Sequence, residues 1–357
     1  MHSVLPSLFS LQFSSMCTIT PYSPDDGPDA DAGSLGSLFS SRLWLRVLSE
    51  TYGFPLFQAV DRAGATRLPF AVPNRSLLSH AISLPFSDYL ETSSISVSAY
   101  QRLLHTIADA YPTAPVICKT TYSPSTDGLG DVDREAMYHR VPTSSHQAVD
   151  EQMRSSFLRN VRQSRECGVT IDRSTSSEAL SQFYRLHRSL RFGKFGIIPQ
   201  PKSFFESIRT VFLKQERGFV LRAHRRGRVI GAFLILQHGS MLYYKFGASA
   251  VDALDYRPNN LLFHTLLHSA VDRDMKAVDL GLAGTSDEYA GLRRFKESFG
   301  GRPHPVTQFR IDPPGYDVER ERELQNVFGQ VTDAVVEHDA NPDVTDAVSQ
   351  ALYPYFA

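Results

Sequence analysis

The chain has 357 residues, of which 42% are hydrophobic, and its 37 basic and 38 acidic residues give a formal net charge of −1. This length fits two domains of ordinary size whose cores need no crosslinks. A net charge near zero gives no argument that the chain as a whole binds nucleic acid or membranes. The three cysteines (Cys17, Cys118 and Cys167) lie far apart and form no CxxC motif. Their spacing excludes a disulfide framework and a cysteine-rich zinc module, and it is typical of a reducing cytosol.

The sequence carries no clear signal for export or membrane insertion. Its longest apolar run, residues 229–236, has eight residues, whereas a membrane-spanning helix needs about 20. Residues 1–16 contain no Lys or Arg and so lack the basic start of a secretory signal, and Met16 is an alternative initiator. We therefore expect a cytoplasmic monomer that can touch a membrane surface without spanning it.

The even charge balance conceals two acidic ends and a basic middle. Residues 1–40 contain four Asp and no Lys or Arg, and residues 317–357 carry a net charge of −7, which leaves +10 for residues 41–316. Pro, Ser, Asp and Gly dominate residues 20–37, which predicts a disordered lead over the first 40 residues. The spacing of apolar side chains near the other end predicts an acidic helical tail over residues 315–357, packed on the body.

Apolar periodicity and turn residues predict the elements between these ends. In the first half they are helices over residues 41–52 and 98–110, strands over 54–60, 81–85 and 116–120, a loop over 121–133 and a polar link over 142–152. In the second half they are helices over residues 153–167, 177–191, 202–215 and 288–299 with another beginning at Pro258, and strands over 219–224, 229–238, 241–247 and 277–280.

The order of elements in the second half is helix, helix, three-strand meander, helix, strand, helix. This is the order of the GNAT acyltransferase fold, although periodicity alone leaves it as one candidate among several α+β folds. We therefore predict an α+β protein and look to short motifs for a more specific assignment.

An ordered set of motifs resembles the FemAB/FemX family of the GNAT superfamily, which includes BioF2-like acyltransferases. The string GLRRFKESFGG over residues 291–301 is similar to the family signature FKxxFG. The strings YKFGAS, PNNLL and VDLG precede it in the family's order, and FLRNVR and SLPFSDY match family elements further upstream. Together the motifs cover roughly residues 40–312.

The resemblance implies two tandem GNAT-like domains facing a shared cleft, which we place at residues 41–145 and 150–312 with a separate sheet in each. It also implies a function, because FemX-type enzymes move an amino acid from an aminoacyl-tRNA to an amine of a peptidoglycan precursor. Two alternatives stay open. One is a CoA- or carrier-dependent N-acyltransferase that acts on an amino sugar or another amine in envelope or exopolysaccharide synthesis, and the other is a non-catalytic protein that binds tRNA or glycan.

Acyl transfer to an amine needs a cation or donor for the oxyanion and a group that removes a proton from the ammonium. The resemblance places the Phe295–Lys296 pair at the catalytic centre, with Lys296 as the cation. We expect Leu292, Phe295 and Phe299 to form the buried helix face and Lys296 to lie at its edge. The alternative is a solvated helix lysine.

Asp88 is the candidate acid, base or ligand of the substrate amine. It lies in a loop that follows a predicted strand, where functional side chains often collect. In the family, an Asp at this position contacts the acceptor. An ordinary turn role for this aspartate is the alternative.

Three basic residues are candidates for binding an anionic acceptor, namely Arg46, Arg191 and Lys194. In FemX-type enzymes a Lys on the first helix and an Arg further along bind the diphosphate of a nucleotide precursor. Arg46 matches the first position, and Arg191 and Lys194 compete for the second. A basic surface without a ligand is the alternative.

Further candidates concern the acyl donor. Arg159, Arg162 and Arg165 recur every three residues. Together with the arginines of residues 222–228 they are candidates for binding the phosphates of tRNA. The alternative is a charged face that only contacts solvent. One of the two side chains Tyr243 and Tyr244 is expected to face the cleft and hold the donor, unless both are core aromatics.

The spacing of His264 and His268, His-x3-His, is one that metal sites use on helices. No Glu follows His264, and Leu266 and Leu267 between the histidines are typical of a core. We therefore predict two partly buried histidines and no metal site.

One absence separates the two kinds of acyl donor. CoA-dependent GNAT enzymes cradle the CoA pyrophosphate with a glycine-rich loop at a helix N-terminus. Here the matching residues 253–260 contain no glycine. This favours an aminoacyl-tRNA donor and no cofactor, with acyl-CoA as the alternative, and an acceptor that is a small-molecule or a nucleotide- or lipid-linked amine.

Overall fold

The computed structural model describes residues 17–24, 36–64, 66–73, 79–338 and 341–356. The strands are β1 (Cys17–Pro21), β2 (Leu56–Asp61), β3 (Arg67–Ala71), β4 (Ala81–Ser83), β5 (Val116–Thr120), β6 (Asp131–Pro142), β7 (Thr170–Ser174), β8 (Gly218–Arg225), β9 (Arg228–His238), β10 (Met241–Ser249), β11 (Ala277–Gly284) and β12 (Arg302–Ile311). The α-helices are α1 (Arg42–Tyr52), α2 (Val97–Ala110), α3 (His146–Glu151), α4 (Ser155–Glu166), α5 (Ser177–Phe195), α6 (Lys202–Val211), α7 (Pro258–Asp272), α8 (Ala290–Glu297), α9 (Val318–Glu337) and α10 (Pro342–Leu352). Short 3₁₀ turns are η1 (Leu38–Ser40), η2 (Leu213–Gln215), η3 (Val251–Tyr256), η4 (Asp287–Tyr289) and η5 (Tyr353–Tyr355).

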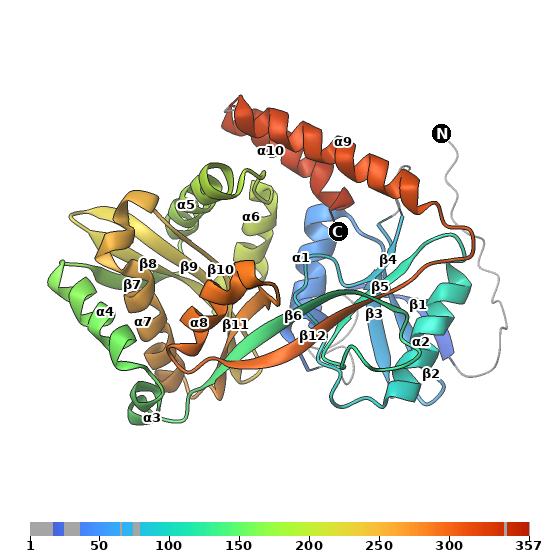
Figure 1. The fold of residues 1–357 in the computed structure, drawn as a ribbon, viewed down its shortest axis with the longest axis horizontal. Helices are drawn as coiled ribbons and strands as arrows, with labels where there is room; N and C mark the ends of the chain where they lie inside the picture. Colours follow the sequence, from blue (N-terminus) through green and yellow to red (C-terminus); the bar gives the residue numbers. More distant parts are fainter. Residues whose placement is uncertain (1–16, 25–35, 65, 74–78, 339–340, 357) are drawn as a thin grey trace.

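The chain forms two α/β lobes, one with β1–β5 and the other with β7–β11, joined by the long strands β6 and β12 (Figure 1). The strand order is β1-β2-β3-β4-β5-β12-β6-β11-β10-β9-β8-β7. The predicted pair of GNAT-like domains is confirmed, but the expectation of two separate sheets is wrong. One hydrogen-bonded sheet of 12 strands crosses both lobes among the described residues.

Strands β6 and β12 make the sheet continuous. They pair antiparallel with each other, β12 then pairs with β5 of the first lobe, and β6 pairs with β11 of the second. The last strand of the molecule therefore returns to complete the first lobe. The sequence does not reveal these strands, because charged residues interrupt both and prolines interrupt β12. The loop expected over 121–133 gives way to β6 at Asp131, and the expected polar link over 142–152 contains helix α3.

A shared aromatic core holds the two lobes together. The rings of Phe39 and Tyr243 lie 6.0 Å apart, and those of Trp44 and Phe204 also lie 6.0 Å apart. Each pair joins a residue of the first lobe to one of the second. Edge-to-face contacts of this kind each contribute about 0.5–1.5 kcal/mol beyond the area they bury. A second core lies under α4 and α7 and belongs to the second lobe alone.

Long periodic elements are where the sequence predicted them, whereas strands without a clear apolar period were not predicted. All of the predicted helices and strands are present within a few residues of their predicted bounds. Strands β1, β3, β6, β7 and β12 were missed. The sequence also predicted disorder for the first 40 residues, which is wrong for Cys17–Pro21 because β1 pairs with β2 over five residues. Residues 1–16 and 25–35 of this lead lie outside the described residues.

The acidic tail is helical and packs on the body, as expected, but it consists of two helices. Glu321 of α9 accepts from both guanidinium nitrogens of Arg310 and lies 3.2 Å from His80. In α10, Asp346 accepts from the Lys202 backbone N–H at 2.6 Å, and Ser349 donates to a backbone carbonyl of the body. Within the described ranges, none of the helices combines the length and the apolar character that a membrane span needs.

Candidate active site

The candidate site lies at the seam between the lobes, where two neighbouring strands stop pairing. Parallel strands β10 and β11 pair from Met241–Ala277 to Tyr243–Asp279, although both strands continue further. Each strand then has an irregularity, β10 at Lys245 in its pairing with β9 and β11 at residues 280–281 in its pairing with β6. Bulges re-aim side chains and are frequent beside active sites. The hydrogen bonding between β10 and β11 is thus interrupted at one point of an otherwise continuous sheet.

An ion pair between the lobes occupies this point. Lys245 Nζ on β10 lies 2.7 Å from Asp88 Oδ1 and donates to the Phe86 carbonyl at 3.3 Å. The ammonium also lies 4.6 Å from the centre of the Phe39 ring and 5.0 Å from that of Trp44. The Lys245 side chain is 5% exposed, so both the carboxylate and the aromatic rings act on a nearly dry charge.

The loop that carries Asp88 is held from two sides. Trp44 Nε1 of α1 donates to Ser87 Oγ at 2.8 Å, and Lys119 Nζ of β5 donates to the Ser87 carbonyl at 3.3 Å. Burial lowers the pKa of Lys119 to about 8, although the Asp88 charge raises it. The position of Asp88 is therefore set by its own lobe as well as by Lys245.

A second polar group lies beside the ion pair. Asp279 of β11 is fully buried, and it accepts from the Tyr89 hydroxyl and from the Gly281 N–H at 2.8 Å. Arg140 lies opposite it in the sheet, with Nε 3.6 Å from Asp279 Oδ2, and donates to Tyr89 and Glu91. Burial raises the pKa of Asp279, whereas Tyr89, Gly281 and Arg140 lower it.

Lys296 is buried beneath the same strand. It is 3% exposed, and its Nζ donates to the carbonyls of Gly281 at 2.8 Å and Leu282 at 2.9 Å. Burial lowers its pKa to about 8, although Asp279 and Asp88 raise it. An ammonium has three N–H donors, so these two carbonyls leave one donor for another acceptor.

The predicted arrangement around Lys296 needs a correction. Leu292 was expected on the buried face of the helix, but it is 41% exposed, whereas Lys296 was expected at the edge and is buried. Phe295 packs in the second core against Phe157 and Phe263, away from the polar group. Helix α8 turns Lys296 toward strand β11, whose carbonyls accept from its ammonium, and leaves Leu292 toward solvent.

Both tyrosines of β10 are core residues. Tyr243 is buried against Phe39, and its hydroxyl accepts from the Leu38 N–H at 3.3 Å. Tyr244 packs between Phe233 and Phe263. Burial raises the pKa of both tyrosines, so both phenols stay neutral. The expectation that one of them holds the acyl donor finds no support in these contacts.

The three candidate anion ligands are not gathered at one point. Arg46 lies near the surface of α1, where its Nε donates to Glu50 at 2.9 Å. Arg191 donates to the Tyr353 hydroxyl at 3.3 Å, and Lys194 lies exposed near the Phe195 ring. The C-terminal segment thus takes up a contact that we had expected an acceptor phosphate to make.

A cavity beside this segment is lined by both signs of charge. It has a volume of about 690 Å³, and its basic wall consists of Arg185 and Arg188 of α5 and Lys202 of α6. Asp343 and Asp346 of α10 line it as well. The acidic tail therefore covers part of the most basic stretch of the second lobe.

The arginines predicted to bind tRNA differ in exposure. Arg159, Arg162 and Arg165 are all exposed on α4. Of the four hairpin arginines, Arg222 pairs with Asp172, Arg228 pairs with Asp252 at 2.7 Å and Arg225 donates to the Cys167 carbonyl at 2.9 Å, whereas Arg226 is exposed. The arginines of α4 are therefore the more exposed of the two groups.

Residues 253–260, which were expected to distinguish a CoA donor from an aminoacyl-tRNA donor, lie in and directly after a compact turn. Residues Val251–Tyr256 form η3, and Arg257 then takes a left-handed conformation with φ 56° ahead of Pro258. Ser249 and Asn259 hydrogen-bond across this turn at 2.6 Å. An open glycine cradle for a pyrophosphate is therefore not formed here.

The two histidines of α7 lie beside a carboxylate. His264 is 12% exposed and His268 is 24% exposed at the side chain, which confirms their partial burial. Burial, His268 and Arg165 lower the pKa of His264 to about 4, although Asp150 raises it. Asp150, which comes from α3, was not predicted as their neighbour.

Four residues of the polar group were missed as site residues, namely Lys245, Asp279, Arg140 and His139. Lys245 and Asp279 belong to the motifs YKFG and VDLG. In each motif a single charged residue lies inside an otherwise apolar strand, and this pattern could have indicated a site residue. His139 of β6 is fully buried, and neither ring nitrogen has a partner within the described part of the chain. Burial and nearby Lys296 lower the pKa of His139 to about 4, so its ring is neutral.

Part of the chain matches a known protein family. Residues 151–297 match the family model described as an acetyltransferase (GNAT) domain. No curated protein matches the sequence. The matched segment includes Lys245, Asp279 and Lys296 but not Asp88, so the family model covers one side of the polar group.

Solved structures resemble most of the chain. A crystal structure of FemX shares 14% identity and a TM-score of 0.60, covering 85% of this chain and 100% of that one. The C-terminal domain of a putative lysylphosphatidylglycerol synthetase from Agrobacterium fabrum has 9% identity and a TM-score of 0.54, covering 84% and 92%. A tandem GNAT protein from the clavulanic acid biosynthesis pathway has 11% identity and a TM-score of 0.50, covering 84% and 100%. The fold is thus that of tandem GNAT proteins.

Proposed function

We propose that this chain, a GNAT-type acyltransferase by its matched domain and its fold, moves an aminoacyl group from an aminoacyl-tRNA to an amine. The observation that carries the proposal is the turn ahead of α7. The usual place for a CoA pyrophosphate is filled by η3, and its hydrogen bonds are internal. A donor anchored elsewhere, through the phosphates of a polynucleotide, fits this surface better.

The acceptor amine must be deprotonated before it attacks the ester. Asp88 lies at the seam within reach of both lobes, and its second oxygen faces Gly281. In the proposed reaction the amine nitrogen attacks the ester carbonyl, and the lost proton passes to Asp88. The C–O bond to the tRNA ribose then breaks, and the leaving hydroxyl takes a proton back. Atoms and charge balance without a cofactor.

Lys296 supports the oxyanion in this scheme. Its two hydrogen bonds to carbonyls fix the ammonium, and a donor fixed in advance costs no reorganisation when charge develops. Few waters compete for it, because the side chain is 3% exposed. Lys245 neutralises Asp88 between turnovers and ties the catalytic loop to the second lobe.

We further propose that the acceptor is an amine of a cell-envelope precursor, such as a peptidoglycan or a lipid-linked intermediate. The motif resemblance to FemX-type enzymes supports this class, as does the shared fold with a putative lysylphosphatidylglycerol synthetase. The reaction would take place in the cytoplasm or at the membrane surface.

A CoA-dependent N-acyltransferase is the second candidate. The description of the matched family as an acetyltransferase favours it. It requires the CoA pyrophosphate to bind somewhere other than a glycine cradle ahead of α7.

The two candidates are separated by their donors. Purified protein is incubated with radiolabelled total aminoacyl-tRNA in one series and with acetyl-CoA in another, each with a panel of amines. We expect amine-dependent loss of label from tRNA, and no such loss with the Lys296→Met variant. Release of CoA thiol without deacylation of tRNA would overturn the proposal in favour of the second candidate.

A further inference from the structure

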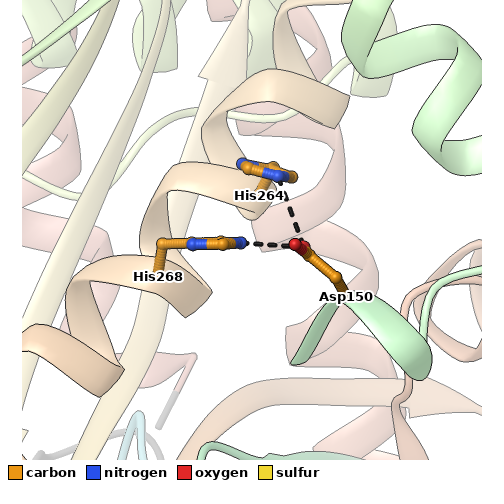
Figure 2. A group of neighbouring side chains, drawn as sticks. All are labelled: Asp150, His264 and His268. Carbon is orange, nitrogen blue, oxygen red and sulfur yellow. Dashed lines mark hydrogen bonds and ion pairs between the residues drawn. The ribbon is translucent and has the colours of Figure 1, made fainter. Parts of the chain in front are cut away.

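A cluster of histidines and carboxylates lies away from the seam, between α3 and α7. His264 and His268 extend from successive turns of α7, and Figure 2 shows both rings directed at the Asp150 carboxylate of α3. Their Nε2 atoms lie 3.6 Å and 2.9 Å from the same oxygen, Asp150 Oδ1. The three ligand atoms all lie within 4.8 Å of one another.

The cluster continues on the far side of His268. His268 Nδ1 lies 2.9 Å from His146 Nδ1, and His146 Nε2 lies 2.9 Å from Asp272 Oδ1. A chain of contacts therefore runs from Asp150 through two imidazoles to Asp272. A carboxylate stands at each end of it.

Counting hydrogens shows that this series of contacts lacks one proton. The three contacts from Asp150 to Asp272 each need one hydrogen, whereas two neutral imidazoles supply only one N–H each. A lone pair of one ring must therefore face another lone pair, unless a further proton or a metal ion is present. The contact between His264 and Asp150 does not change this count, because a neutral His264 brings one N–H of its own.

A metal ion satisfies every group. If His268 Nε2 binds a metal, its Nδ1–H can donate to His146 Nδ1, and His146 Nε2–H can donate to Asp272. Metal-bound histidines usually donate their other N–H in this way, which fixes the ring. Zinc–nitrogen bonds of about 2.0–2.1 Å place tetrahedral ligands about 3.3 Å apart, close to the spacings found here.

We propose that Asp150, His264 and His268 bind a divalent transition-metal ion of the zinc class, with His146 and Asp272 orienting His268. Two imidazoles and one carboxylate are suitable ligands for zinc and leave a fourth position for water. Because α3 lies in the segment that joins β6 to α4, the ion would pin this segment to α7. The site lies outside the proposed reaction and does not depend on it.

Calorimetric titration of the untagged, EDTA-treated full chain with zinc chloride tests the site. We expect one ion per chain and a higher melting temperature with zinc than in EDTA. His264→Gln combined with His268→Gln should abolish both effects. His146→Ala should weaken binding about 10–100-fold, as loss of an orienting partner does. His105→Gln, at an exposed position on α2, is the matched control and should bind like the unchanged protein.

Three outcomes would overturn the proposal. The first is no saturable zinc binding by a chain whose circular dichroism shows it to be folded. The second is equal binding by the double histidine variant. The third is an increase in melting temperature on acidification in EDTA that zinc does not reproduce at neutral pH, because a proton would then supply the missing charge.

Discussion

Lys296 and Asp88 border the same residue, Gly281, although they lie 208 positions apart in the chain. Lys296 Nζ donates to the Gly281 carbonyl at 2.8 Å, and Asp88 Oδ2 lies 3.5 Å from the place where a Cβ on this glycine would be. Gly281 takes φ +69°, a conformation that side chains rarely adopt. The charged residues of both lobes are thus organised around one point of the backbone.

Lys296→Met should lower turnover about 10²–10³-fold, because one preorganised donor to the oxyanion is lost. Stability should change little, since two effects oppose one another. Removing a buried ammonium whose pKa is lowered to about 8 gains about 3 kcal/mol, and leaving two buried carbonyls without a partner costs about 1–3 kcal/mol each. Single-turnover rates and melting temperatures measure the two effects.

Lys276→Met is the control for this substitution, because Lys276 is exposed and distant from the polar group. It should leave turnover unchanged. Full activity in the Lys296→Met protein would remove Lys296 from the mechanism. A large fall in melting temperature would instead assign it a structural role.

Activity and the free energy of unfolding should change in opposite directions as the pH rises above about 8. Activity that needs the Lys296 ammonium falls as the pH rises through about 8, the lowered pKa of this group. The free energy of unfolding, by contrast, should rise between about pH 8 and pH 10.5, because the unfolded chain then holds a proton that the folded chain has lost. Subtracting the profile of Lys296→Met isolates this lysine from Lys119. A flat difference profile would contradict the lowered pKa.

The Asp88–Lys245 pair should show strong coupling in a double-mutant cycle. Asp88→Asn or Lys245→Met alone leaves a buried charge without its partner, which costs about 3–5 kcal/mol. The double variant should lose much less than the sum. The exposed pair Arg228–Asp252 is the control, and its coupling should be close to zero because solvent screens it. Chemical denaturation measures all of these variants, and equal coupling in the two pairs would contradict the buried position of Lys245.

Gly281→Ala should reduce activity more than its effect on stability explains. A left-handed conformation costs a non-glycine residue about 1–2 kcal/mol. Gly168→Ala carries the same penalty, since Gly168 has φ +77° with nothing within 4 Å of the added Cβ. The two variants should therefore lose similar stability, but only Gly281→Ala strains the residue whose carbonyl binds Lys296 and places a methyl group against Asp88. Equal turnover in both would separate Gly281 from the site.

The sequence predicted the fold well wherever an element is long and periodic. Helices α5 and α7 and the meander β8–β10 carry enough apolar residues to give a clear period. Strand β12 could not be predicted in the same way, because Pro303 and Pro305 interrupt it and its partner β5 is distant in sequence. The continuous sheet is a consequence of that long-range pairing.

The site could be predicted only in part, for a related reason. Asp88 and Lys296 were found through motifs, whereas Arg140 belongs to no motif and is recognisable only by its position opposite Asp279. Lys245 was visible in the motif YKFG, but nothing local distinguishes a lysine that bridges two lobes from one that faces solvent. Burial and pairing depend on tertiary structure.

The three exposed arginines of α4 give the final prediction, which concerns the donor. Replacing Arg159, Arg162 and Arg165 by Gln should weaken tRNA binding. It should also reduce the steepness with which the logarithm of the binding constant falls with the logarithm of the salt concentration by about 2–3, since each phosphate contact contributes about 0.7–0.9. Replacing Arg62, Arg67 and Arg102 by Gln removes the same charge from exposed positions of the first lobe and should leave the slope nearly unchanged. Filter binding at several salt concentrations measures both triple variants. If both lose the same slope, attraction is set by net charge alone, and α4 is then no specific tRNA surface.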